Sequence, residues 1–227
     1  GTTPIQAVLM GRDALGVDIN PLSIALTEPR LIPQSLSSIK IRLEEVDWSY
    51  SGEVDQDLLV FYHPETLNQI YALRRWLLIR EQAGELDAAD KWIRMVALNR
   101  LTGHSPGFFS VYTMPPNQAV TAEAQKKINK KRKQIPPQRD VPTLILKKSN
   151  SLLKNGHIVD DRSYALLAAS ADSTPEINNG AVDLVVTSPP FLDVVQYTTD
   201  NWLRCWFLGI DPASVSIAMH KKPDEWT

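Results

Sequence analysis

The start of the chain alternates quickly between helical and extended patterns. Residues 3–11 predict a helix, because Thr-Pro favours a helix start, apolar positions follow at helical spacing, and glycine is a frequent terminator. The apolar run 14–19 predicts a short strand, and Asn-Pro at 20–21 predicts the start of another helix. This helix–strand–helix order is typical of an α/β domain with a mostly parallel sheet.

The same kind of pattern returns near the end of the chain. The apolar runs 164–169 and 182–187 predict two further strands, the second of them a buried parallel strand. Residues 194–208 then predict a helix. Cys205 lies in this apolar helix, where a buried and unreactive thiol is expected.

The middle of the chain has a longer, helical period. Residues 64–80 and 86–101 predict amphipathic helices, 57–62 a strand, and 102–120 a loop punctuated by glycine and proline. The apolar positions that carry the two helical patterns are Leu67, Ile70, Leu73, Leu77, Trp92, Met95 and Val96.

Composition narrows the class of protein. With 227 residues, 43% hydrophobic and 22% charged, the chain has the makeup of an ordinary globular protein. A single cysteine excludes an internal disulfide framework, and no Cys/His cluster has zinc-ligand spacing. No apolar run approaches the roughly 18–20 residues that a membrane span needs. We therefore expect a cytoplasmic protein with no metal site and no membrane association.

Positive charge is concentrated in one segment. Residues 121–154 hold ten basic and two acidic residues, a net +8, which leaves −10 for the remainder because the total is −2. Such a block either binds nucleic acid or forms a solvated, mobile loop. Lone loop residues such as His104 and Tyr112 could also touch nucleic acid, although such residues are more often structural. The candidate nucleic-acid-binding residues are Lys126, Lys127, Lys130, Lys131, Arg132 and Lys133.

The sharpest chemical feature follows the strand predicted at 182–187. This strand runs directly into Ser188, Pro189, Pro190 and Phe191. Ligands of open α/β sheets bind beyond the carboxyl ends of the strands, which is where this turn would lie. The two prolines fix the backbone, so a carbonyl can be aimed at a substrate without an ordering cost during reaction. We therefore expect a functional site at this turn.

Thr-Ser-Pro-Pro-Phe over 187–191 resembles the catalytic motif of the S-adenosylmethionine-dependent amino-methyltransferases that modify cytosine N4 or adenine N6 in DNA. Gly-Thr-Thr over 1–3, then a helix and Gly-Val-Asp-Ile-Asn-Pro over 16–21, is similar to that family's cofactor-binding half. The resemblance covers residues 1–45 and 160–210, and the pairing of the two motifs is specific.

This resemblance implies an α/β fold with three regions. Residues 1–45 would be a partial cofactor-binding half, 46–158 an inserted, mainly helical region with the basic segment as a target-recognition element, and 159–227 a catalytic half truncated at its C-terminus. In the family the glycine loop begins upstream of the first residue here. We therefore expect an incomplete Rossmann-like methyltransferase sheet, and a chain that is inactive by itself.

The resemblance also implies which residues hold S-adenosylmethionine. The first three residues would let the backbone approach the methionine part at a helix N-terminus. Asp18 would accept hydrogen bonds from the ribose hydroxyls, although a carboxylate beside Asn20 could instead cap the next helix. Asp172 resembles the acid that contacts the adenine amino group, with Ala171 where the family has glycine. The implied cofactor-binding residues are Gly1, Thr2, Thr3, Asp18, Ile19 and Asp172.

The catalytic motif implies a mechanism for an exocyclic amine. Ser188 Oγ and the Pro189 carbonyl would accept hydrogen bonds from the NH₂ group, which draws the nitrogen toward tetrahedral geometry and frees its lone pair. Pro190 would keep the turn rigid, and Phe191 would stack on a base that has left the duplex. In the family, a serine at the position that matches Ser188 is more typical of enzymes that modify cytosine N4 than of those that modify adenine N6.

Two alternatives remain at this point. One is a related enzyme that methylates adenine N6 in DNA or acts on RNA, and the other is a catalytically inactive chain that only binds nucleic acid. The family resemblance makes DNA the expected partner and allows a cognate partner from a restriction-modification system.

Overall fold

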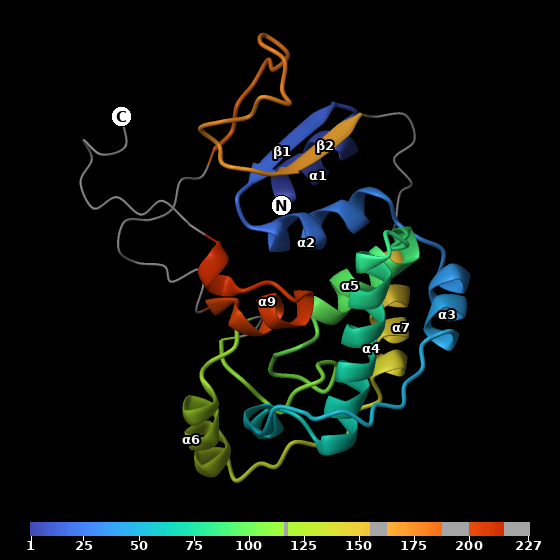
Figure 1. Ribbon diagram of the computed structural model, residues 1–227, viewed down its shortest axis with the longest axis vertical. Helices are drawn as coiled ribbons and strands as arrows, with labels where there is room; N and C mark the ends of the chain where they lie inside the picture. The colour runs from blue at the N-terminus through green and yellow to red at the C-terminus, as the bar shows by residue number, and fades with distance from the viewer. Residues whose placement is uncertain (116–117, 155–162, 188–199, 216–227) are drawn as a thin grey trace, which may run out of the picture.

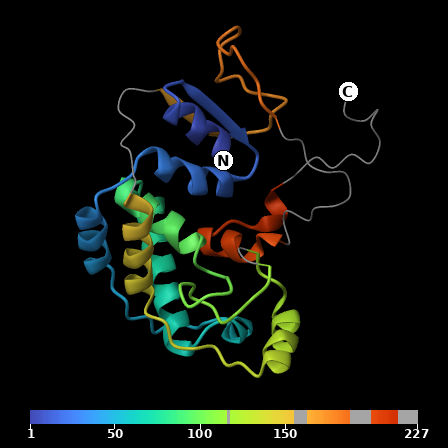
Figure 2. The same ribbon diagram turned by 180° about the vertical axis from the view of Figure 1, so that it is seen from behind.

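The computed structural model describes residues 1–115, 118–154, 163–187 and 200–215. In both views the molecule is elongated (Figures 1 and 2). The strands lie at one end of the long axis, a body of helices fills the middle, and helix α6 lies at the other end.

The sheet within the described residues consists of two parallel strands. β1 (Ala14–Asp18) pairs with β2 (Tyr164–Ala168) over five residue pairs, from Ala14 with Tyr164 to Asp18 with Ala168. Both strands confirm predictions made from their apolar patterns. The fold is mixed α/β, as expected, and this small parallel sheet is compatible with a methyltransferase fold.

Helices α1 (Thr2–Leu9) and α2 (Pro21–Leu31) pack on the sheet. Val8, Ala14 and Leu31 form the buried centre of this small cluster. Gly11 follows α1 with φ of +74°, which confirms it as the terminator. Asn20 caps α2, because its side-chain oxygen accepts a hydrogen bond from the Leu22 N–H at 2.9 Å.

The start of α1 differs from the prediction. The N-cap is Gly1 and not Thr3, so Thr3 lies inside the first turn. Gly1 is held against α2, where an added β-carbon would come within 2.3 Å of Thr27 Oγ1. A β-carbon at this position would therefore displace the Thr27 side chain, so the contact between the start of α1 and α2 favours glycine there.

The remaining elements form the helical body and its surroundings. In chain order they are α3 (Leu36–Glu44), η1 (Gln56–Val60), α4 (Pro64–Gln82), α5 (Ala88–Leu98), α6 (Ala122–Arg132), α7 (Val141–Leu153), α9 (Trp202–Leu208) and η2 (Pro212–Ser214).

One hydrophobic core unites this body with parts of both α/β stretches. The apolar stripes predicted for α4 and α5 are buried, including Ile70 and Val96 at 0% exposure. Leu22 of α2 and Phe207 of α9 belong to the same core. Cys205 of α9 is buried, as predicted. The helical body therefore shares one packed core with α2 and α9, which belong to the two separate α/β stretches.

Two predicted strands do not form. Residues 57–62 enter the 3₁₀ helix η1, because the Asp55 carboxylate accepts a hydrogen bond from the Asp57 N–H at 2.9 Å and caps a helical turn. Residues 182–187 contain no strand and are exposed, with Val185 at 76%. In the doubly wound strand order 3-2-1-4, the fourth strand pairs with the first. If β1 and β2 are the second and third strands of this order, residues 182–187 would be the fourth. The first strand, with which they would pair, is not among the described strands.

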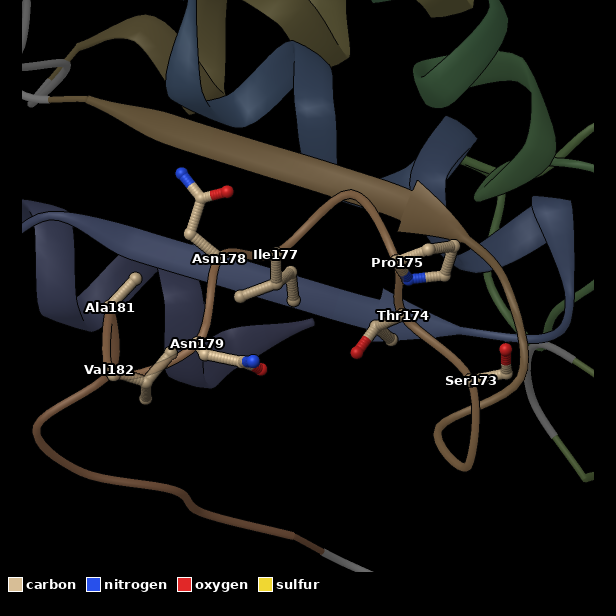
Figure 3. Close-up of a pocket in the computed structure, with 9 residues that line it drawn as sticks. Ser173, Thr174, Pro175, Ile177, Asn178, Asn179, Ala181 and Val182 are labelled. Carbon is tan, nitrogen blue, oxygen red and sulfur yellow. The ribbon is translucent and has the colours of Figure 1, made fainter.

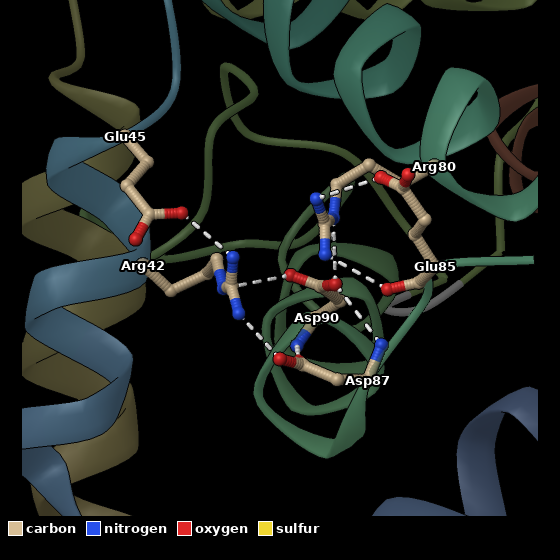
Figure 4. A network of polar contacts seen from close by, with 6 residues as sticks. All are labelled: Arg42, Glu45, Arg80, Glu85, Asp87 and Asp90. Atoms are coloured by element: carbon tan, nitrogen blue, oxygen red, sulfur yellow. Dashed lines mark hydrogen bonds and ion pairs between the residues drawn. The ribbon is translucent and has the colours of Figure 1, made fainter. Parts of the chain in front are cut away.

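A buried carboxylate ties three helices together. Asp90 of α5 is 0% exposed and accepts a hydrogen bond from Arg80 Nε of α4 at 2.9 Å, which raises the pKa of Arg80. Its other oxygen lies 3.2 Å from Arg42 Nε of α3. Asp87 caps α5, shares a reciprocal capping box with Asp90, and also contacts Arg42 (Figure 4). Arg42 and Arg80 additionally pair with Glu45 and Glu85.

Replacing Asp90 with Asn should lower the free energy of unfolding by about 3 kcal/mol, because it leaves two partly buried arginines facing a neutral group. Urea denaturation would measure the loss. The matched control is Glu44→Gln, which breaks only an exposed pair with Lys40 and should leave the urea midpoint unchanged. Equal stabilities of the two variants would contradict a structural role for the Asp90 network.

Candidate functional site

Parallel pairing brings two acidic residues to one edge of the sheet. Asp18 is the last residue of β1 and lies opposite Ala168, the last residue of β2. Asp172 follows four residues later in an exposed turn. The carboxyl ends of both strands therefore meet where an α/β sheet binds its ligands. Ile19, which is 36% exposed, also lies at this edge.

The Asp18 carboxylate is engaged with the start of α2. Its Oδ1 accepts a hydrogen bond from the Asn20 N–H at 2.8 Å, and its Oδ2 accepts one from the Ser23 hydroxyl at 2.6 Å. This is the helix-capping arrangement that was the alternative interpretation of Asp18. A carboxylate has about four lone-pair sites, so two contacts leave it able to accept further hydrogen bonds.

The first residues of α1 point to the same edge of the sheet. A β-carbon added to Gly16 would lie 3.7 Å from Pro4 at the start of α1, whereas Val8 near the helix end packs with Ala14. The helix therefore runs antiparallel to β1, and Gly1, Thr2 and Thr3 lie toward the Asp18 end. All three are exposed. A helix N-terminus and a carboxylate at one sheet edge form an arrangement suited to a nucleotide-like ligand.

The loop after β2 forms a pocket beside this edge. Ser173, Thr174 and Pro175 lie near the carboxyl end of a strand, and the loop then turns back along the sheet (Figure 3). In Figure 1 this loop, drawn in orange, lies on the far side of the sheet from α2. The pocket is lined by Ser173, Thr174, Pro175, Ile177, Asn178, Asn179, Gly180, Ala181 and Val182.

The sequence did not point to this pocket. Its walls come from a single loop whose serine, threonine and asparagine side chains carry no motif. It directly follows Asp172, so it borders the predicted cofactor edge. The predicted catalytic residues Ser188, Pro189, Pro190 and Phe191 lie outside the described residues.

The basic segment contains two helices, and the alternative of a mobile loop is wrong for the described part. α6 begins at the Thr121 N-cap, whose hydroxyl accepts a hydrogen bond from the Ala124 N–H at 3.2 Å. Its last turn carries three cations, which suit the negative end of the helix dipole. All six candidate residues are exposed: Lys126, Lys127, Lys130, Lys131, Arg132 and Lys133.

A polar network that the sequence did not reveal anchors the inner face of α6. Asn129 donates a hydrogen bond to the Val60 carbonyl at 2.7 Å and accepts one each from Gln125 and Gln134. Gln125 is 0% exposed, and Gln125 and Gln134 both donate to the Tyr112 carbonyl at 3.0 Å. The amides hold the helix in place, which leaves its lysines to face solvent.

The six basic residues are not equivalent. The Arg132 guanidinium lies 3.6 Å from the centre of the Tyr112 ring, and Lys126 lies 3.7 Å from an Asp57 carboxylate oxygen. Lys127, Lys130 and Lys131 have helical spacing that places them on one face of α6. Of the two loop residues considered for DNA contact, Tyr112 has Arg132 as a structural partner. The other, His104, is exposed, and its ring lies 6.1 Å from that of Phe108.

Metal and membrane features are not found in the described ranges. No three His, Cys, Asp or Glu side chains converge there so as to hold a metal ion. No helix in that part of the chain combines the length and apolar character needed to cross a membrane.

Comparison with known proteins gives one informative match. The chain is 24% identical to the Type II methyltransferase M.BsoBI of Geobacillus stearothermophilus over 257 aligned residues, which cover 95% of this chain and 46% of that protein. The chain thus spans about half the length of the curated relative. Neither a family model nor a solved structure matches it. The similarity supports a methyltransferase, and its span takes in the helical region as well as both α/β stretches.

Proposed function

We propose that this chain is part of an S-adenosylmethionine-dependent methyltransferase that modifies the exocyclic amine of a base in DNA, with cytosine N4 favoured. The observation that carries the proposal is the edge of the sheet where Asp18, Asp172 and the start of α1 meet. The similarity to a Type II methyltransferase supports the same class of reaction. Adenine N6 is the second candidate target.

The residues at this edge fit the proposed cofactor. Asp18 would accept hydrogen bonds from the ribose hydroxyls through its remaining lone pairs, and Asp172 would accept one from the adenine amino group. The first turn of α1 would face the methionine carboxylate, which favours a helix N-terminus. When bound, S-adenosylmethionine would supply an electrophilic methyl group.

The Ser-Pro-Pro-Phe motif would act on the base. Ser188 Oγ and the Pro189 carbonyl would accept hydrogen bonds from the amine, which makes its lone pair available to attack the methyl carbon. Attack would form a nitrogen–carbon bond as the carbon–sulfur bond of the donor breaks, so that the neutral thioether leaves and the extra proton on nitrogen passes to solvent. The acceptors stabilise the positive charge that develops on nitrogen. Phe191 would stack on the base outside the duplex.

The exposed lysines of α6 would contact DNA phosphates. Residues 124–139 contain seven basic residues and no acidic residue. Phosphate contacts position a protein on the duplex but carry little sequence information, so α6 would supply affinity and orientation.

Asp18→Asn should weaken S-adenosylmethionine binding at least about tenfold, because a neutral amide replaces a charged hydrogen-bond acceptor. Isothermal titration would measure it in the protein expressed with its complete native sequence. The matched control is Asp13→Asn at the other end of β1, where the carboxylate accepts a hydrogen bond from the Ser163 N–H at 3.0 Å. Equal losses in both variants would make Asp18 only a capping residue.

Ser188→Ala should reduce methyl transfer about a hundredfold, or ~3 kcal/mol, while cofactor affinity stays within a factor of a few. The assay follows a labelled methyl group from S-adenosylmethionine into duplex DNA, and nucleoside analysis of the product separates N4-methylcytosine from N6-methyladenine. A variant that keeps more than half the parent rate would remove Ser188 from the mechanism. If the parent protein transfers no labelled methyl group to the DNA, the proposed function is wrong.

Changing Lys127, Lys130 and Lys131 together to Ala should reduce the salt slope of log K for duplex binding by about 2.7, or roughly 0.9 for each lost phosphate contact. Preference for target over non-target duplex should not change, since backbone contacts do not read bases. The control variant changes the exposed lysines Lys40, Lys147 and Lys154. If the control lowers the slope as much, α6 is not the phosphate-binding element.

A further inference from the structure

The segment that joins α6 to α7 exposes an unusual side chain. Ile135 is 86% exposed, more than any other large apolar side chain in the described ranges. One residue, Gln134, separates it from the basic turn of α6, and Pro136-Pro137 follows it directly. Because an apolar side chain stabilises a fold through its burial, an isoleucine at such a position contributes nothing to the stability of the folded chain.

The backbone around Ile135 is held on both sides. Before it, Gln134 donates hydrogen bonds to the Tyr112 carbonyl at 3.0 Å and to Asn129 Oδ1 at 2.8 Å. After it, the Arg139 N–H donates to the hydroxyl of buried Thr66 at 2.7 Å, and that hydroxyl donates back to the Arg139 carbonyl at 2.9 Å. The prolines between these anchors have fixed φ. The exposed side chain is therefore presented by a constrained backbone.

Basic residues precede this side chain in the sequence. Lys133 ends α6 in a left-handed conformation with φ of +51°, which turns the chain sharply just before Ile135. Lys130, Lys131 and Lys133 are exposed in the last turn of the helix. The nearest acidic residues in sequence are Glu123 and Asp140, so the whole segment between them is positive.

An apolar tip within a lysine-rich surface fits a polyanion better than a protein. Lysine is depleted from protein–protein interfaces, whereas DNA offers phosphates on either side of apolar base steps. Proteins that bend DNA insert isoleucine and similar apolar side chains between base steps while cations hold the backbone.

We propose that Ile135 is an apolar wedge that enters a base step of duplex DNA whose phosphates are held by the α6 lysines. The inference rests on the DNA substrate of the proposed function and extends it to a separate contact. In Figures 1 and 2, α6 lies at the opposite end of the molecule from the sheet. The wedge therefore distorts the duplex away from the methylated base, and it orients DNA without taking part in chemistry.

The test compares three variants of the protein expressed with its complete native sequence. Ile135→Ala should weaken duplex binding about tenfold, which corresponds to the lost burial of an isoleucine side chain. Binding to single-stranded DNA should stay within about twofold, because a single strand has no paired step to open. Ile135→Leu should keep most of the affinity. Ile41→Ala, which removes another exposed isoleucine (59%) on α3, should leave binding unchanged.

Two further measurements separate a wedge from other contacts. The salt slope of Ile135→Ala should equal that of the parent, since no phosphate contact is lost. The end-to-end distance of a doubly labelled duplex, measured by energy transfer, should shorten with the parent and with Ile135→Leu, but less with Ile135→Ala.

Each contrary result has a distinct meaning. If Ile135→Ala binds and bends the duplex as the parent does, the wedge is wrong. If the variant instead abolishes self-association in sedimentation and leaves DNA binding intact, Ile135 docks on protein and the wedge is again wrong. A parent that bends duplex through Ile135 yet transfers no methyl group would overturn the proposed function and leave the wedge standing. A parent that binds no duplex would overturn both.

Discussion

The pairing of β1 with β2 is the interaction on which the candidate site depends. These strands are separated by nearly the whole helical region, and five residue pairs in parallel register join them. Parallel strands end at the same edge, so this pairing alone places Asp18 beside the turn that carries Asp172. Loop closure over so many residues carries an entropic cost that two short strands cannot offset alone. Packing of the chain between the strands therefore contributes to the stability of their pairing.

The helical body supplies that compactness. Its core is shared with α2, which follows β1 directly, and with α9, near the end of the described chain. The buried Asp90 then fixes the relation of α3, α4 and α5, because a fully buried carboxylate tolerates few positions for its two arginines. A region inserted between two strands thus acts as their scaffold, and the match to the Type II methyltransferase runs through it as well.

Local patterns predicted the elements whose stabilising contacts lie within one helix or one pairing of strands. The α4 and α5 stripes and the Asn20 cap of α2 are of this kind, and so are the two strands, whereas the predicted Thr3 cap of α1 is not found. Residues 182–187 show the limit: an apolar run favours a strand, but a strand also needs a neighbouring edge, which no local pattern reveals. In the same way, the amides that anchor α6 depend on carbonyls of distant residues, so charge alone could not distinguish a fixed helix from a solvated loop.

The separation of the two functional regions constrains how DNA would bind. Under the proposed function, the acidic sheet edge would favour a cationic cofactor and repel phosphates, whereas the basic surface of α6 would attract them. Because the helical body lies between the two, a duplex that touches both must run along the long axis of the molecule. Its backbone would then be held mainly at the α6 end, and only the flipped base would need to approach the carboxylates. A base is neutral, so its approach to Asp18 and Asp172 would carry no such repulsion. Under the proposed function, the division of charge along the molecule would favour entry of the base over entry of the backbone.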